Sequence, residues 1–197
     1  PYEDFPNLPG AHFRRNMAFA FSLAKELGID EETACRAARK FCLPAHRIER
    51  IGSINDVLYI NDSSATIPEA TVHALHCFPN TSTIIFGGYD RRVDLSLLEH
   101  ELESIDNINI IALPDTGHTI AQKILQRSPH MTPKIHFAQT LTEAVELSYS
   151  LCPSGTTCLF SPAAASYHQF TNYQERGDLF RSLIQSHSNW KPNPTLE

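Results

Sequence analysis

The sequence lacks the patterns that mark several common classes of protein. No apolar run approaches the roughly 20 residues of a membrane-spanning helix, and the first residues show no signal-peptide pattern. There is no run of Lys and Arg, and the formal net charge is −6, which argues against nucleic acid or a membrane surface as a partner. The sequence therefore predicts a cytoplasmic protein.

Recognisable catalytic and metal-binding patterns are absent as well. The five cysteines show no C-x-x-C spacing and lie mostly in apolar patterns, as buried thiols of a reducing compartment do. The ten histidines have no zinc-ligand spacing, and neither a Ser-His-Asp order nor a pair of catalytic carboxylates can be recognised. No G-x-x-x-x-G-K-[ST] loop for nucleotide phosphates occurs. The sequence thus predicts no metal site and no catalytic residue.

The sequence has the composition of a globular protein and an alternating pattern. Of the 197 residues, 42% are hydrophobic and 19% are charged. Strands are expected at 48–53, 57–61, 82–86, 108–113, 134–137 and 156–160, and helices at 66–77, 95–102, 117–126, from 140 onward and at 176–187. Strands that alternate with helices of this length predict an α/β fold, a Rossmann-like, mainly parallel sheet with helices on both faces.

A pair of helices precedes this alternation. The first has an apolar face that includes Leu23 and Leu27, and the second follows Asp30 as its N-cap. The break at Leu43-Pro44 indicates a domain boundary. We therefore expect a helical unit over residues 1–42, an α/β domain over 43–190 and a tail over 191–197, whose final Leu-Glu is typical of a cloning scar.

Two spacings predict how helices begin within the α/β part. Thr66 with Glu69, and Thr140 with Glu143, match the capping box. Ligands in such folds bind beyond the carboxyl ends of the strands. The loops after the strands that end near residues 61, 86, 113 and 160 are therefore the places for a binding site.

Three of these loops, and one further segment, carry motifs. They read Asn61-Asp62-Ser63-Ser64-Ala65-Thr66, Gly87-Gly88-Tyr89-Asp90-Arg91, the stretch 161–178, and Leu43-Pro44-Ala45-His46-Arg47. Together, and in their order along the chain, they resemble the C-terminal part of the Mur ligases, most closely the MurD-like members that add glutamate. The resemblance runs from about Leu8 to about Ser186. It implies that the helix pair ends a central ATPase domain and that the C-terminal Rossmann-like domain follows.

The resemblance also implies an activity. Such a ligase joins glutamate to UDP-N-acetylmuramoyl-L-alanine in peptidoglycan synthesis, using ATP and Mg²⁺ and passing through an acyl phosphate. The phosphate-binding loop and the Mg²⁺ ligands would lie in an N-terminal portion. We therefore expect a monomer whose partners are glutamate, ATP and the UDP-linked substrate, and we expect the 197 residues alone to be inactive.

The resemblance assigns residues to two sites. The nucleotide would be contacted by Asn16, His46, Arg47 and Asp62. The amino-acid substrate would be contacted by Thr66, Arg91, Ser166, Tyr167 and Tyr173, with Ser64 and His168 nearby. Without the resemblance, Thr66 reads as a helix cap, Arg91 as a surface residue and Tyr173 as a core aromatic.

Several of these residues depart from the family pattern. Ser64 and Arg91 stand where the family usually has lysine, and His168 stands where it usually has aspartate. All three belong to the amino-acid side, so a retuned site is expected, such as that of the branch that adds L-glutamate. Two further alternatives are a noncatalytic module that binds a nucleotide or an amino acid, and a ligase that adds diaminopimelate or lysine.

Overall fold

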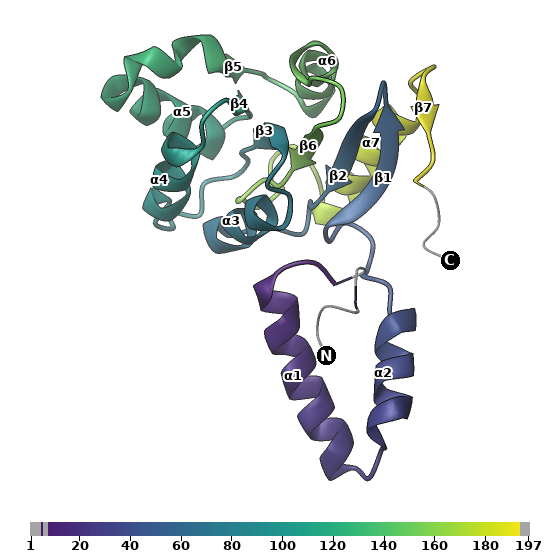
Figure 1. Cartoon of the computed structure of the whole chain (residues 1–197). Helices are drawn as coiled ribbons and strands as arrows, with labels where there is room; N and C mark the ends of the chain where they lie inside the picture. Colours follow the sequence, from purple (N-terminus) through teal and green to yellow (C-terminus); the bar gives the residue numbers. More distant parts are fainter. Residues whose placement is uncertain (1–4, 6–7, 194–197) are drawn as a thin grey trace. The chain divides into compact units, whose positions relative to one another are not determined.

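The computed structural model describes Phe5 and residues 8–193, which fall into two compact units, Pro1–Pro44 and Ala45–Glu197 (Figure 1). The sequence placed this boundary after residue 42.

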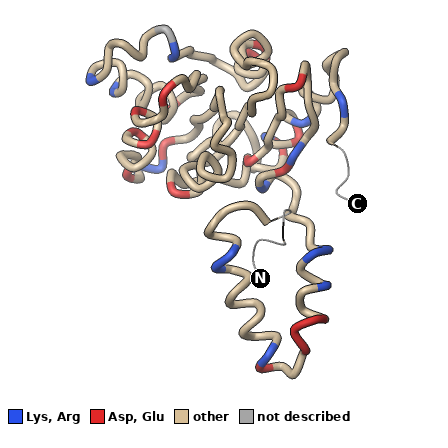
Figure 2. The backbone as a smooth tube through the Cα atoms, in the orientation of Figure 1, with Lys and Arg blue, Asp and Glu red and all other residues tan. Residues whose placement is uncertain are grey.

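The first unit contains two helices, α1 (Ala11–Glu26) and α2 (Glu31–Lys40). Asp30 caps α2 as expected, because its Oδ1 accepts a hydrogen bond from the Thr33 backbone N–H at 2.8 Å. Figure 2 shows acidic residues at the start of α2 and basic residues at its end. That order complements the dipole of the helix and favours its formation.

The prediction of which face of α1 is buried is wrong. Leu23 and Leu27 are 61% and 69% exposed, whereas Phe13 and Met17 are the buried residues of this helix. Apolar residues occur on more than one side of α1, so periodicity alone did not identify the side that is covered.

The second unit is built on a seven-stranded sheet in the order β5-β4-β3-β6-β2-β1-β7. The strands are β1 (Glu49–Ile54), β2 (Val57–Asn61), β3 (Thr81–Phe86), β4 (Asn109–Ala112), β5 (Ile135–Phe137), β6 (Thr157–Phe160) and β7 (Trp190–Lys191). Neighbours from β5 to β2 pair in parallel, while β1 is antiparallel to both β2 and β7. The mainly parallel sheet expected from the sequence is confirmed.

The hairpin between β1 and β2 turns at Asn55 and Asp56, as expected. Both residues have positive φ, 51° and 63°, which suits the primed turns that connect twisted strands.

Helices connect the parallel strands and cover both faces of the sheet (Figure 1). They are α3 (Pro68–Cys77), α4 (Ser96–Ser104), α5 (Thr116–Arg127), a 3₁₀ segment η2 (Pro129–Lys134), α6 (Leu141–Leu151) and α7 (Tyr173–Gln185). Helices α6 and α7 contact one another, and α4 contacts both α3 and α5. The expected Rossmann-like α/β fold is thus confirmed.

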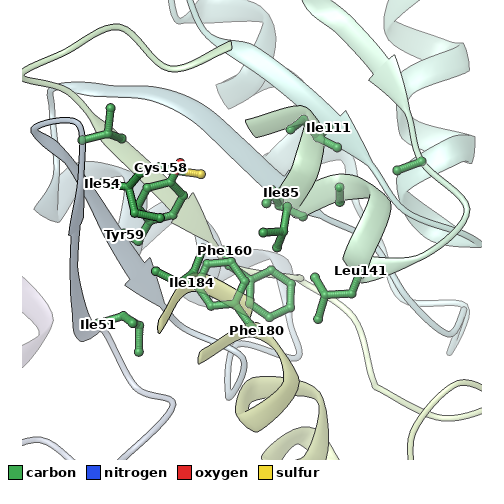
Figure 3. Close-up of a cluster of buried hydrophobic side chains, with 14 of the residues drawn as sticks. Ile51, Ile54, Tyr59, Ile85, Ile111, Leu141, Cys158, Phe160, Phe180 and Ile184 are labelled. Atoms are coloured by element: carbon green, nitrogen blue, oxygen red, sulfur yellow. The ribbon is translucent and has the colours of Figure 1, made fainter. Parts of the chain in front are cut away.

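One hydrophobic core lies between the sheet and the helices α6 and α7, as Figure 3 shows. Phe160 of β6 stacks on Phe180 of α7 with ring centroids 4.7 Å apart, and Leu141 and Ile184 belong to the same cluster. This packing fixes the start of α7 against the end of β6. Tyr173, one of the expected site residues, is the first residue of α7.

Two local expectations are corrected. Thr66 does not cap α3: the helix begins at Pro68, after Ile67, and no side chain caps it. Proline keeps the residue before it extended, so the helix cannot begin earlier. In addition, Lys191, which the sequence placed in the tail, belongs to β7, while residues 194–197 lie outside the described part of the chain.

Candidate functional site

Four loops meet at one edge of the sheet because they follow parallel strands. They comprise residues 62–67 after β2, 87–95 after β3, 113–115 after β4 and 161–172 after β6. The carboxyl ends of such strands are where ligands bind in this class of fold. The structure therefore gathers the three loop motifs into one region.

A small cavity of about 70 Å³ lies among the loops that follow β3, β4 and β6. Its lining includes three of the expected residues, Ser166, Tyr167 and His168. Thr66, Arg91, Ser64 and Tyr173 do not line it. Of the residues expected to bind the amino-acid substrate, three thus line this cavity and four do not.

Aromatic side chains surround one side of the cavity. The ring of Tyr89 contacts Tyr167 edge to face at 5.8 Å and His168 at 4.5 Å. The Tyr89 backbone N–H donates to the Ala165 carbonyl at 2.9 Å, which holds the loop after β3 against the loop after β6. The sequence did not single out Tyr89, although it lies within a motif and next to two glycines.

Arg176, in the first turn of α7, joins two loops beneath this region. Its Nε donates to Ser63 Oγ at 3.0 Å, its Nη2 to the Ser63 carbonyl at 2.8 Å, and its Nη1 to the Ala164 carbonyl at 3.1 Å. The residue is only 2% exposed. Burial lowers the pKa of Arg176 to about 10, so the guanidinium stays charged at neutral pH.

Asp62, at the end of β2, is buried too. Its Oδ1 accepts from the Ile48 backbone N–H at 3.1 Å and its Oδ2 from the Ser161 hydroxyl at 2.8 Å. Burial raises the pKa of Asp62 to about 7, against the opposing effect of these hydrogen bonds and of the charge of Arg47. Asp62 thus ties the end of β2 to Ile48 and to Ser161 after β6, and its pKa lies near neutrality.

His46 links the expected nucleotide residues to the amino-acid residues. Its ring is buried, with Nδ1 3.1 Å from Asn61 Nδ2, and it contacts the ring of Tyr173 edge to face at 6.2 Å. Its carbonyl accepts from the Ser64 backbone N–H at 3.0 Å. The structure therefore brings together His46, Ser64 and Tyr173, which the sequence assigned to two neighbouring sites.

The remaining expected residues are placed as follows. The Arg91 guanidinium donates to the Thr66 carbonyl. These two residues, both expected to bind the amino-acid substrate, therefore lie in contact. Arg47 is exposed and lies close enough to Asp62 to affect its charge. Asn16 is exposed on α1 and belongs to the other unit.

Across Phe5 and residues 8–193, no group of three or more His, Cys, Asp or Glu side chains could hold a metal ion. Over those same residues, no helix is both long and apolar enough to cross a bilayer.

This chain is similar in sequence to several known proteins. A UDP-N-acetylmuramoylalanine–D-glutamate ligase from Chlamydia pneumoniae is 35% identical over 175 residues, which are 88% of this chain and 40% of that enzyme. The enzyme of the same name from Aquifex aeolicus is 35% identical over 177 residues, 89% of this chain and 41% of the relative. No family model matches the chain. The chain therefore spans about two-fifths of the length of these relatives.

A solved structure gives the same picture of the fold. The crystal structure of MurF from Acinetobacter baumannii matches with a TM-score of 0.64 at 18% identity, over 88% of this chain and 37% of that one. At this identity the match concerns the fold alone. The sequence similarity to the named ligases covers nearly the whole of this chain and about two-fifths of theirs, and a solved Mur ligase shares its fold, so the chain resembles one part of the Mur ligases.

Proposed function

We propose that this chain is the glutamate-receiving and nucleotide-contacting part of a UDP-N-acetylmuramoylalanine–D-glutamate ligase. The observation that carries the proposal is the 35% identity to a ligase of that name over 88% of the chain. The gathering of the loop motifs at one sheet edge supports it. The proposed enzyme is a cytoplasmic monomer of cell-wall synthesis.

The proposed reaction forms an amide bond. The carboxylate of UDP-N-acetylmuramoyl-L-alanine is phosphorylated to an acyl phosphate, and the amine of glutamate then displaces phosphate. On this chain Ser166, Thr66, Arg91 and Tyr173 would orient glutamate. These residues would act by positioning the substrate and by neutralising its charge, since an amine that is held near an acyl phosphate needs no protein nucleophile.

On the nucleotide side, His46, Arg47, Asp62 and Asn16 would contact ATP. The cation of exposed Arg47 suits a phosphate. The described residues hold no cluster of metal ligands, so we assign Mg²⁺ to residues elsewhere in the ligase. The sequence also contains no G-x-x-x-x-G-K-[ST] loop, and the 197-residue chain alone should not turn over.

Phosphate release tests the proposal. The polypeptide encoded by the complete reading frame is incubated with ATP, Mg²⁺ and UDP-N-acetylmuramoyl-L-alanine, with D-glutamate or L-glutamate at equal concentration. Release with D-glutamate is expected. Release with L-glutamate alone would instead assign the chain to the L-glutamate-adding branch and would attribute the change to Ser64, Arg91 and His168.

A matched pair of serine variants tests where glutamate binds. Ser166→Ala should raise the KM for glutamate, because Ser166 lines the cavity, whereas Ser150→Ala, on the exposed side of α6, should not. Activity with diaminopimelate or lysine but not glutamate would indicate a related ligase. Absence of turnover with every amino acid would indicate a noncatalytic binding module.

A further inference from the structure

Two cysteines lie side by side near the start of β6, away from the site described above. Cys158 is fully buried on β6, among the core side chains drawn in Figure 3. Cys152 directly follows α6, is partly exposed and packs against the same core. The two thiols are free, and they are close enough to share a hydrogen bond. Neither residue lines the cavity, which lies among loops that follow the strands.

The turn that connects the two cysteines, residues 153–156, is held in place. Gly155 has a φ of 79°, and its backbone N–H donates to the Asp56 carbonyl at 3.0 Å. The Thr156 hydroxyl donates to the Pro153 carbonyl at 2.6 Å. The fold thus keeps the two sulfur atoms together. A bond between sulfur atoms that already lie close requires no large movement of the backbone.

The surroundings of Cys152 favour its thiolate. The hydrogen bond with Cys158 lowers the pKa of Cys152, against the opposing effect of burial, and the hydroxyls of Thr83 and Ser82 lower it further. Thr83 is the register partner of Cys158 on β3, and among the described residues its buried hydroxyl has no hydrogen-bond partner while Cys152 is a thiol. A thiolate at Cys152 would accept from this hydroxyl. Thiolates, not thiols, react with peroxides and disulfides.

The two other cysteines of this unit differ from Cys152. Burial, together with the charge of Asp62, raises the pKa of Cys77 to about 11. Burial also raises the pKa of Cys158 well above its ordinary value, so that Cys158 stays protonated next to a thiolate. One thiol of the pair is therefore suited to attack an oxidant, and the other is placed to react with the product.

We propose that Cys152 and Cys158 form a peroxide-sensitive dithiol that closes reversibly to a disulfide. The Cys152 thiolate attacks one oxygen of hydrogen peroxide, the O–O bond breaks, and Cys152 becomes a sulfenic acid as hydroxide leaves. The Cys158 sulfur then attacks the Cys152 sulfur, the S–O bond breaks, and water leaves with the Cys158 proton. The hydroxide takes up the proton that Cys152 had released. Two thiols thus pass two electrons to one peroxide and give one disulfide and two water molecules.

This inference does not depend on the proposed function, because the pair lies outside the candidate site. Disulfides of reducing compartments are typically transient and act in catalysis or in redox sensing. A pair that is partly exposed on one side and buried on the other fits such a transient bond. The partly exposed sulfur meets the small oxidant, and the buried sulfur is shielded from other thiols.

Mass spectrometry of the wild-type 197-residue chain tests the proposal. The chain is treated with an equimolar amount of hydrogen peroxide, alkylated with iodoacetamide in urea and digested with trypsin. The tryptic peptide 135–176 contains Cys152 and Cys158 and no other cysteine. It should lose two hydrogen atoms and carry no alkyl group. Addition of dithiothreitol before alkylation should restore two alkyl groups.

Two results in the wild-type chain would overturn the proposal. In the first, peptide 135–176 keeps two alkyl groups after peroxide treatment. In the second, the disulfide joins peptide 135–176 to peptide 51–91, which would make Cys77 the partner. Neither result depends on whether a variant folds.

Three variants test the order of the steps. Cys158→Ala should stop at the sulfenic acid of Cys152, which dimedone traps, and Cys152→Ala should leave Cys158 in its thiol form. Cys77→Ala is the matched control from the same unit and should form the disulfide as wild type does. Oxidation of Cys158 at an unchanged rate in Cys152→Ala would overturn the assignment of Cys152 as the attacking thiol.

Discussion

The buried carboxyl group of Asp62 should make the stability of the second unit depend on pH. Its pKa is raised from 3.8 to about 7 in the folded protein, mainly by burial. The unfolded chain therefore releases this proton near pH 4, while the folded chain keeps it until near pH 7. Because the folded state binds more protons between these values, the free energy of unfolding should fall as the pH rises from about 4 to about 7 and should then level off.

The size of this effect follows from the shift. Each pKa unit corresponds to about 1.4 kcal/mol, so the full change from pH 4 to pH 7 is on the order of 4 kcal/mol. Asp62→Asn removes the titration with little change in shape. An asparagine oxygen can accept from the Ile48 N–H, and its NH₂ group can donate to the Ser161 hydroxyl.

The assay is urea unfolding of wild type and Asp62→Asn at a series of pH values between 5 and 8.5. Fluorescence of Trp190, the single tryptophan, reports on the unit that contains Asp62. The free energy of unfolding of wild type minus that of the variant should decrease by about 1.4 kcal/mol for each pH unit below pH 7. A difference that stays constant over this range would refute the reasoning, since it would mean that Asp62 has the same pKa in both states.

Two further predictions concern packing and capping. Gly177→Ala places a Cβ atom 2.2 Å from His46 Nδ1, so it should lower the free energy of unfolding by about 1 to 3 kcal/mol despite the better helix propensity of alanine. In a His46→Ala background the same change should be neutral or stabilising, and an unchanged loss in both backgrounds would contradict the contact. Thr140→Ala removes the cap to the Glu143 N–H and should cost about 1 kcal/mol. Thr66→Ala should cost clearly less in the same urea titration, and equal losses would show that Thr66 is a cap after all.

The sequence predicted the fold well where local patterns decide it. Runs such as Thr81–Phe86 are rich in β-branched residues and alternate with amphipathic helices, so the mainly parallel sheet could be expected. Thr140 and Asp30 cap their helices as predicted. The short strand β7 was missed because two residues carry no periodicity of their own.

The sequence predicted less where tertiary packing decides. Arg176 is a charged residue near a helix start, which by itself predicts exposure, and its burial depends on loops that lie far away in the sequence. The motifs indicated which loops meet, yet they gave no sign that a guanidinium lies beneath them. The roles of Asn16, Arg47 and Asp62 toward a nucleotide remain predictions.

The contact between Arg176 and Ser63 also has a consequence for the order in which the protein is made. The two residues are 113 positions apart, and α7 is the last helix among the described residues. A ribosome therefore releases Ser63 long before the guanidinium that holds it, and contacts of such long separation form late in folding. Nascent chains that stop before α7 should hold strands β1 to β6 and lack Arg176, so the lining of the cavity is complete only once α7 has been synthesised.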